Sequence, residues 1–486
     1  MSDFHAVYPE YAATSRLDEL RASEYAYLDE GGHVYLDYTG SGLAARSQLR
    51  AQATRLRSGC YGNPHSDNPT SIASTRLVER ARTAILRYFN ATAGDYAVIF
   101  TPNATGACRL VAESYPFRRG TRLVLTADNH NSVNGIREFA KPRGARVSYV
   151  PLTGPELAVR EDAVLAALGR GHGLFAFPAQ SNFTGVQHPL RFVRDAQAAG
   201  YDVLLDAAAF VPANRLDLGA VRPEFVAVSF YKMFGFPTGI GCLLAGRDAL
   251  ARLRRPWFSG GTILGASAQG GWHQLLDGAG AFEDGTLNFL AIPDVEVGLD
   301  WITGVGIDMI HRRVSMLTSW LLRCLGTLRH SSGAPMIRLY GPGAGSGVAR
   351  GGTVAFNFLD PDGHLVDERA VARDASAAGI SLRTGCFCNP GAGERAFGLT
   401  SADLRGPWWA RGLSGQRFAR QRFSLGGLST VDDYLTLIGL PTGGAIRVSF
   451  GIASTLADVD SFLDFAERTY RDRPPDLAGL APRLNC

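Results

Sequence analysis

Lys232 is the residue of this chain whose type and position most clearly suggest chemistry. The chain has 49 lysines and arginines, and only Lys141 and Lys232 are lysines. Arginine replaces lysine where only a positive charge is needed, but it cannot lose a proton and form a covalent imine. Lys141 lies in a polar, turn-like stretch, so we expect it to be solvated. Lys232 follows the apolar run 225–230 and precedes a glycine-rich loop. It is therefore either a reactive amine or a lysine that merely ends a strand.

Two further polar side chains follow apolar runs in the same way. Asp206 closes the run 203–205, where an unpaired carboxylate would be costly. It either pairs with a cation, such as a protonated ring nitrogen, or caps the next turn. His130 follows the run 123–125 and is either an acid–base or ring-stacking group or a structural histidine. Asn182, after the run 175–177, leaves the same two interpretations open.

The stretch 103–106 opens a helix directly after a strand. Its exposed backbone N–H groups suit a phosphate, although a simple capping turn has the same pattern. Because the carboxyl ends of parallel strands meet at one edge of a sheet, we expect five residues to lie close together: Thr105, His130, Asn182, Asp206 and Lys232. An anion site, a ring stacker, a polar group, a carboxylate and an imine-forming lysine are what pyridoxal 5′-phosphate requires. The sequence therefore predicts this cofactor.

Two cysteines and one arginine are candidates for contacts with a substrate beside the predicted cofactor site. Cys386 and Cys388 lie in a glycine- and proline-containing loop, and their spacing is too tight for the usual zinc sites, so no metal is expected. They are either nucleophilic or redox thiols or two cysteines without a special role. Arg447 is a charge within an apolar strand, so it either meets an anion, for which a substrate carboxylate would be a natural partner, or stays solvated.

The elements that must position these residues form a regular alternation. Seven short apolar runs are separated mostly by helical patterns: 97–100, 122–125, 146–150, 174–177, 203–205, 225–230 and 241–244. This predicts an α/β fold whose large domain has a seven-stranded, mostly parallel sheet covered on both faces. From about residue 295 longer helices and the strands 353–358 and 446–450 predict a smaller α+β domain.

We expect three parts: an N-terminal arm joining the small domain (1–44), a large domain (45–297) and a small C-terminal domain (298–486). The arginine-, glycine- and tryptophan-rich stretch 393–427 is aperiodic and predicts an insertion.

Composition narrows the functional classes. The apolar fraction is 46% and the net charge is +4, without a basic run interleaved with aromatic residues, so we expect a globular protein that does not bind nucleic acid. We expect no signal peptide and no membrane span, because neither an apolar h-region nor a long apolar run is visible. Seven cysteines without framework spacing favour a reducing compartment, so the cytoplasm is expected.

The chain resembles the class V aminotransferase family of fold-type I pyridoxal phosphate enzymes. Within it, the cysteine-desulfurase-like domain of molybdenum cofactor sulfurases is the most similar branch. The motifs that carry the resemblance span nearly the whole chain: Tyr35-Leu36-Asp37, 62–66, 128–130, 178–185, 205–209, 229–239, 260–262, 282–286, the Cys386 loop and 446–451. Tyr231 stands where housekeeping desulfurases carry histidine, which favours the molybdenum sulfurase branch.

The resemblance implies a role for each candidate residue. Lys232 would bind the cofactor covalently and move the Cα proton, while Asp206 would pair with the ring nitrogen. His130 would stack on the ring, and Asn182 would approach the ring oxygen. The phosphate would be held by Ala104, Thr105, Ser229 and Tyr231, and by Thr262 from the other subunit of a homodimer. Arg447 would bind the substrate carboxylate, with Asn182, His65 and Arg383 also near the substrate. Cys388, five residues after Arg383, would be the sulfur nucleophile, with Cys386 as a second catalytic candidate.

The resemblance predicts an enzyme that cleaves the C–S bond of L-cysteine or a cysteine-derived substrate, leaving a persulfide on Cys388 for a possible acceptor protein. The chain stops at Cys486, so we expect no further domain for molybdenum cofactor. This keeps a second hypothesis open. It is an enzyme of specialised metabolism that acts on an S-substituted cysteine by β-elimination, transamination or aldehyde formation, without Cys388. A third hypothesis is a non-catalytic, cofactor-bearing partner subunit.

Overall fold

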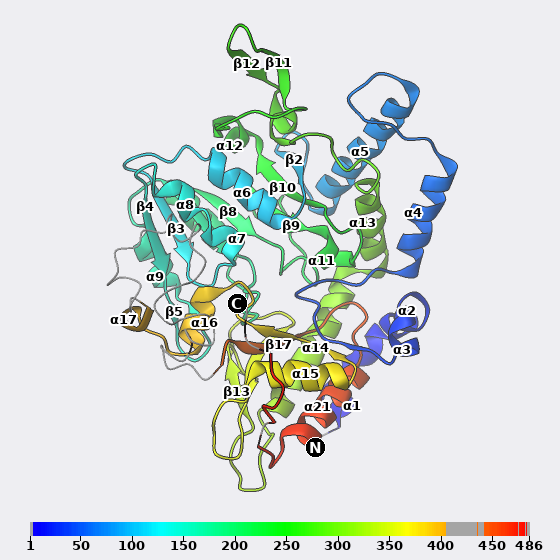
Figure 1. Cartoon of the computed structure of the whole chain (residues 1–486), viewed down its shortest axis with the longest axis vertical. Helices are drawn as coiled ribbons and strands as arrows, with labels where there is room; N and C mark the ends of the chain where they lie inside the picture. The colour runs from blue at the N-terminus through cyan, green and yellow to red at the C-terminus, as the bar shows by residue number, and fades with distance from the viewer. Residues whose placement is uncertain (1–2, 405–434, 436–441, 475, 482, 484–486) are drawn as a thin grey trace.

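The computed structural model describes the chain except for residues 1–2, 405–434, 436–441, 475, 482 and 484–486 (Figure 1). Its largest sheet has seven strands in the order β2-β10-β9-β8-β7-β3-β4. The strands are β2 (Tyr96–Thr101), β3 (Arg122–Thr126), β4 (Arg146–Val150), β7 (Gly173–Pro178), β8 (Tyr201–Asp206), β9 (Phe225–Ser229) and β10 (Gly241–Gly246). The strand β10 pairs antiparallel with β2 and β9, and the other pairs of neighbouring strands in this sheet are parallel. The prediction of a seven-stranded, mostly parallel sheet is therefore confirmed.

Apolar side chains cover both faces of this sheet, which explains why its strands are continuous apolar runs. Alternate residues of one strand enter different cores: Val98 packs into one and Ile99 into the other. Helix α5 (Pro69–Tyr88) contributes Val78 and Ile85 to the first core and packs on β2 and on α13 (Pro293–Val305). Helix α6 (Ala104–Ser114) belongs to the second core and packs on β9 and β10.

The remaining helices of this region connect or flank the strands. They are α4 (Arg46–Ser58), α7 (Asn131–Asn134), α8 (Arg137–Ala140), α9 (Glu161–Leu168), α10 (Phe192–Ala198), α11 (Phe230–Phe234), α12 (Arg247–Arg252) and the 3₁₀ turn η2 (Gly278–Phe282). Two hairpins extend from the same region, β5 (Leu152–Thr153) with β6 (Ala158–Val159), and β11 (Ile263–Ser267) with β12 (Trp272–Leu275). The second hairpin projects from the top of the molecule in Figure 1.

A four-stranded antiparallel sheet forms the core of the C-terminal part, below the large sheet in Figure 1. Its order is β13 (Ile337–Tyr340), β14 (Thr353–Phe358), β17 (Ala445–Ser449) and β16 (Arg383–Gly385). The helices of this part include α14 (Ile307–Leu325), α15 (Glu368–Ala377), α16 (Pro390–Ala396), α17 (Ser401–Leu404) and α21 (Leu456–Tyr470). Longer helices and the strands 353–358 and 446–450 were predicted here and correspond to α14, β14 and β17, so the α+β character is confirmed.

The N-terminal arm packs on the C-terminal part of the chain. It contains α1 (Phe4–Val7), η1 (Pro9–Thr14), α2 (Arg16–Glu24), α3 (Tyr27–Glu30) and β1 (Val34–Tyr35), which pairs in parallel with β15 (Ile380–Ser381). Arg313 of α14 is fully buried and donates to Thr14 and to the carboxylate of Asp18 in the arm. The division into 1–44, 45–297 and 298–486 stays a prediction, and α13 runs through its second boundary.

Two further predictions, the insertion at 393–427 and the absence of a membrane span, can be compared with the structure only over the residues that it describes. Helix α16, with Pro390 in its first turn and an Asn389 cap, continues to Ala396 and α17 follows, so the stretch 393–427 begins within a helix, and its being an insertion stays a prediction. Residues 405–427 lie outside the described part of the chain. Among the described residues, every helix is too short or too polar to cross a lipid bilayer.

Candidate active site

One cavity of about 270 Å³ lies at the carboxyl ends of the parallel strands. Eight of the residues singled out in the sequence line it together: Ala104, Thr105, His130, Asn182, Asp206, Ser229, Tyr231 and Lys232. They come from the carboxyl ends of β2, β3, β7, β8 and β9 or from the segments that follow; β9, β8, β7 and β3 are consecutive in the sheet, and β10 separates β2 from β9. This is the arrangement expected of a doubly covered parallel sheet, where ligands bind beyond the strand ends.

Lys232 is presented by the short helix α11, which begins directly after β9. Removal from water lowers the pKa of its amine, and the carboxylate of Asp206 opposes this shift. No residue of the described chain forms a hydrogen bond with the amine. A partly buried lysine with a lowered pKa and no hydrogen-bond partner is suited to react with a carbonyl group. Lys141, the other lysine, is exposed at the end of α8, as expected.

Asp206 and His130 lie within electrostatic reach of Lys232. Asp206 is buried at the end of β8, and its Oδ1 accepts the backbone N–H of Ala208 at 3.0 Å. It therefore caps the following turn and also leaves a carboxylate oxygen in the cavity wall. Burial lowers the pKa of His130, while Asp206 opposes the shift, so the ring is mainly neutral at pH 7. A neutral imidazole can stack on an aromatic ring.

The start of α6 forms the polar end of the cavity. The side chain of Asn103 caps this helix by accepting the N–H of Gly106, and the N–H of Ala104 donates to Ser229 Oγ at 3.0 Å. Thr105 Oγ1 and Ser132 Oγ are 2.7 Å apart. Ser132 was missed in the sequence, although its position two residues after His130 is a local signal. Hydroxyl groups gathered at a helix N-terminus suit a phosphate group.

These residues fit pyridoxal 5′-phosphate. The cavity joins a hydroxyl-rich helix N-terminus with a buried carboxylate, a neutral histidine and an unpaired lysine amine. Gly241 helps to form it, because a Cβ at this position would lie 2.7 Å from the backbone of Asn103. Ala104, Thr105, Ser229 and Tyr231 would hold the phosphate, and Asp206 would hold the ring nitrogen.

Arg447 and Arg383 lie beside this cavity rather than in its lining. Arg447 is buried on β17; one terminal nitrogen donates to the carbonyl of Asn182 at 3.0 Å and the other to Asp37 Oδ1 at 2.9 Å. Its Nε is buried without a hydrogen-bond partner. Arg383 pairs with the other oxygen of Asp37 at 2.7 Å. Asp37 therefore contacts both arginines, and its single negative charge leaves the group with one net positive charge beside the cavity. The role of Asp37 was missed, because only the folded chain brings residue 37 to these two strands.

The cysteine loop packs against the same region. Cys388 is exposed and Cys386 is partly buried, and neither lines the cavity. Phe387 and Cys388 have φ angles of 54° and 53°, in the left-handed region that non-glycine residues rarely adopt. The ring of Phe387 packs 5.2 Å from that of Phe183 and 4.7 Å from the Arg447 guanidinium. The loop is therefore held against the site by its backbone and by Phe387.

Thr262 and His65 lie away from this chain's own cavity. Thr262 is buried and donates to the carbonyl of Ser259 at 2.8 Å, while His65 Nε2 lies 3.3 Å from the carbonyl of Gly285. Both residues lie close to Gly261, because a Cβ there would lie 3.4 Å from the His65 ring and Thr262 is its neighbour in the chain. A contribution of Thr262 to a second subunit's site stays a prediction.

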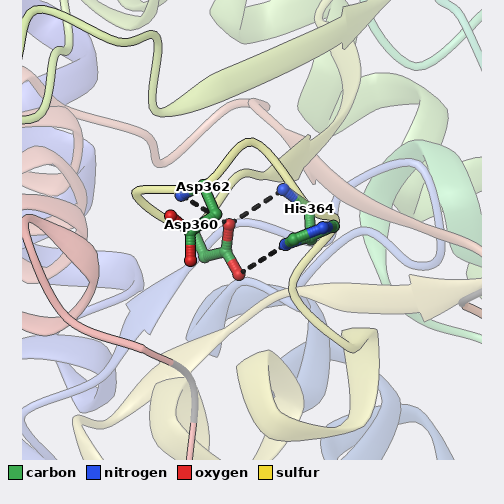
Figure 2. A group of neighbouring side chains, drawn as sticks. All are labelled: Asp360, Asp362 and His364. Atoms are coloured by element: carbon green, nitrogen blue, oxygen red, sulfur yellow. Dashed lines mark hydrogen bonds and ion pairs between the residues drawn. The ribbon is translucent and has the colours of Figure 1, made fainter.

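A group of Asp360, Asp362 and His364 (Figure 2) has the composition of a cation site but is explained by a turn. Asp360 Oδ1 accepts the backbone N–H groups of Asp362 at 3.0 Å and His364 at 2.8 Å. The group closes the hairpin in which Leu359 pairs with Leu365. These hydrogen bonds account for the grouping without a metal.

The lowered pKa of Lys232 makes its reactivity pH-dependent in a defined direction. An unperturbed lysine is half neutral near pH ~10.4. We expect reductive methylation of Lys232 in cofactor-free protein to reach its plateau at a lower pH, because the amine deprotonates earlier. In Asp206→Asn the plateau should move lower still, since the carboxylate raises the pKa. Peptide mass spectrometry measures the methylation of Lys232 and of Lys141 separately. A methylation profile of Lys232 with its midpoint at or above pH ~10.4 would contradict a lowered pKa of this lysine.

Comparisons of the chain with a family model, with curated proteins and with solved structures agree with one another. The model of the family "Aminotransferase class-V" matches residues 34–462. Molybdenum cofactor sulfurase of Solanum lycopersicum is 34% identical, covering 99% of this chain and 61% of the relative. That of Bos taurus is 37% identical, covering 92% and 51%. The apo structure of a cysteine desulfurase from Thermococcus onnurineus NA1 is 21% identical with a TM-score of 0.74, covering 93% of this chain and 98% of its own. The chain thus spans about half to three-fifths of the curated relatives it matches.

Proposed function

Because the chain belongs to the class V aminotransferase family, we propose that it cleaves the C–S bond of L-cysteine or a cysteine-derived substrate and takes the sulfur onto Cys388. The chain is a pyridoxal 5′-phosphate enzyme with the fold-type I architecture. One observation carries the proposal. The unpaired amine of Lys232 shares a cavity with His130 and Asp206, and the Cys388 loop is hydrogen-bonded to Asn182 in the wall of that cavity.

Each residue near the cavity has a defined task in this proposal. The cofactor, when bound, supplies a ring that withdraws electrons from the substrate's Cα. Lys232 Nζ would hold the cofactor and afterwards take the proton from Cα. Asp206 would favour a protonated ring nitrogen, because a carboxylate stabilises a nearby cation. His130 would lie against the ring. Arg447, which lies beside the cavity, binds the substrate carboxylate, while Asp37 keeps its guanidinium in place.

The sulfur step belongs to Cys388. Its thiolate forms an S–S bond to the substrate sulfur while the Cβ–S bond breaks, and the electron pair of the broken bond stays with carbon. Protonation of that carbon, together with return of the Cα proton from Lys232, gives alanine, and the sulfur remains on Cys388 as a persulfide. The exposure of Cys388 leaves it open to an acceptor, which we propose to be a second protein.

Product analysis with L-cysteine tests this proposal. Purified, cofactor-loaded protein is incubated with L-cysteine, and alanine, pyruvate, sulfide and protein-bound sulfane sulfur are each measured. Alanine together with bound sulfane sulfur in equal amounts is the expected result. Pyruvate with sulfide and no alanine would overturn it.

A second candidate function rests on a specific observation. Because neither cysteine lines the cavity, the site can also be used without a sulfur nucleophile. An S-substituted cysteine would then undergo β-elimination to a thiol, pyruvate and ammonia. This activity would survive replacement of Cys388 and would be lost on replacement of Lys232, which separates it from the first proposal. Transamination or aldehyde formation would be revealed by the corresponding product in the same assay.

We also propose that the chain works as a homodimer. Large apolar side chains are exposed on and beside the β11–β12 hairpin: Trp257, Phe258, Leu264 and Trp272. Such a patch favours a protein contact, and the hairpin carries Thr262 at its base.

Leu264→Asp is therefore expected to convert the dimer to monomers in sedimentation velocity, because a charge would be buried in the interface. Leu264 is 73% exposed in the single chain, so the substitution leaves its fold intact. Leu477→Asp, at a site 54% exposed elsewhere, is the matched control and should remain dimeric. A wild-type protein that sediments as a monomer would contradict the proposal.

A further inference from the structure

We propose that Asn389 is a positioning residue that orients the amide of Asn182 and locks the Cys388 loop onto the cavity wall. The proposal rests on the proposed function, since it takes Cys388 as the sulfur acceptor. Asn389 is fully buried and follows Cys388 directly. Its Nδ2 donates to Asn182 Oδ1 at 2.9 Å and to the carbonyl of Asp128 at 2.7 Å. Both amide protons of a buried side chain are therefore committed to the site.

The first consequence concerns the direction of the Asn182 amide. Its oxygen is occupied by Asn389, and its Nδ2 donates to the carbonyl of Phe387 at 2.8 Å. A flipped amide would bring two N–H groups together at Asn389 and two oxygens together at Phe387. Asn389 thus fixes Asn182 with its N–H side toward the cysteine loop, and one Asn182 proton remains for the cofactor in the cavity.

The second consequence concerns the cysteine loop. Phe387 and Cys388 both lie in the left-handed region, which is unfavourable for side chains with a Cβ, so the turn needs hydrogen bonds from outside. It receives them on two sides. The N–H of Asn131, next to His130, donates to the carbonyl of Cys388 at 2.7 Å, and Asn182 donates to that of Phe387. Asn389 connects the second of these bonds to the segment that carries His130, through Asp128.

Asn389 has one further contact, which must be separated from this role. Its Oδ1 accepts the N–H of Ala392 at 3.2 Å and so caps α16. Asparagine, aspartate and serine all cap helices well, because capping needs only a side-chain acceptor. Asparagine also has two amide donors, whereas aspartate has none and serine has a single hydroxyl donor on a shorter side chain. Asn389→Asp therefore keeps the cap and the size of the residue but removes both donors.

The experiment compares wild type, Asn389→Asp and Asn389→Ser in the cofactor-loaded full chain. Losing donors to buried acceptors should speed hydrogen exchange of the Asn131 amide and of the 386–389 segment by about tenfold or more. Because Asn182 is no longer fixed, the absorbance maximum of the bound cofactor should shift. For alanine formation from L-cysteine, kcat should fall about tenfold or more while KM changes less than about twofold, because Asp37 still holds the Arg447 guanidinium.

A residue that acts only as a helix cap gives the opposite result. Exchange, absorbance and kcat of Asn389→Asp would then equal wild type, and the proposal would be overturned. If neither variant folds, hydrogen exchange of the wild type alone tests the proposal. The Asn131 amide must then exchange at least about 100-fold slower than an unprotected amide. Exchange at the unprotected rate would overturn the proposal that the cysteine loop is locked onto the cavity wall. Exchange and absorbance do not depend on the reaction. A wild type that forms no alanine would therefore refute the proposed function and leave the test of Asn389 intact.

Discussion

Lys232→Arg is expected to lower turnover of L-cysteine by at least about 10³-fold, because arginine keeps the charge but can neither bind the cofactor covalently nor take up the Cα proton. Alanine formation measures the loss. Borohydride reduction followed by peptide mapping measures the covalent link, which should be found at Lys232 in wild type and nowhere in the variant.

Lys141→Arg is the matched control, since it is the chain's other lysine and lies exposed at the end of α8. It should retain wild-type turnover and labelling. Turnover by Lys232→Arg within tenfold of wild type, or cofactor trapped at Lys141, would show that the cavity described here is not the reaction site.

Cys388→Ser is expected to abolish alanine formation from L-cysteine, with a loss of at least about 10³-fold, because a serine oxygen does not replace the thiolate as sulfur acceptor. The variant should still bind the cofactor, since Cys388 does not line the cavity. Its absorbance spectrum with and without L-cysteine checks that substrate binding survives.

Cys386→Ser tests whether the two thiols of the loop differ. Cys386 lies two residues earlier and is partly buried, whereas Cys388 is exposed. We expect this variant to keep alanine formation within about tenfold of wild type. Equal losses in both variants would mean that the thiols act together. A silent Cys388→Ser would favour the β-elimination alternative.

The sheet and the cavity could be predicted from the sequence because their signals are local. A buried parallel strand is recognised in the sequence as an apolar run. A polar residue at the end of such a run is a candidate for binding a ligand at the edge of the sheet. Asp206 and Lys232 follow β8 and β9 in this way, and the topology alone brings them together. Lys232 carried an added signal, because lysine is so rare in this chain.

The surroundings of Arg447 and Cys388 could not be predicted, because they depend on contacts between distant segments. Asp37 reaches Arg447 across 410 positions of the chain, and Asn389 reaches Asn182 across 207. The Asn389-Pro390 pair is a helix-start signal, so a cap was predictable there. Nothing local indicates that the same side chain also donates to the cavity wall.

The mass of the Cys388 peptide after a single turnover shows whether this thiol takes the sulfur. Cofactor-loaded wild type is mixed with less than one equivalent of L-cysteine, quenched with an alkylating reagent and digested. We expect a Cys388 peptide heavier by one sulfur atom, in an amount equal to the alanine formed, and an unchanged Cys386. Alanine or pyruvate formed without added sulfur on Cys388 would contradict it.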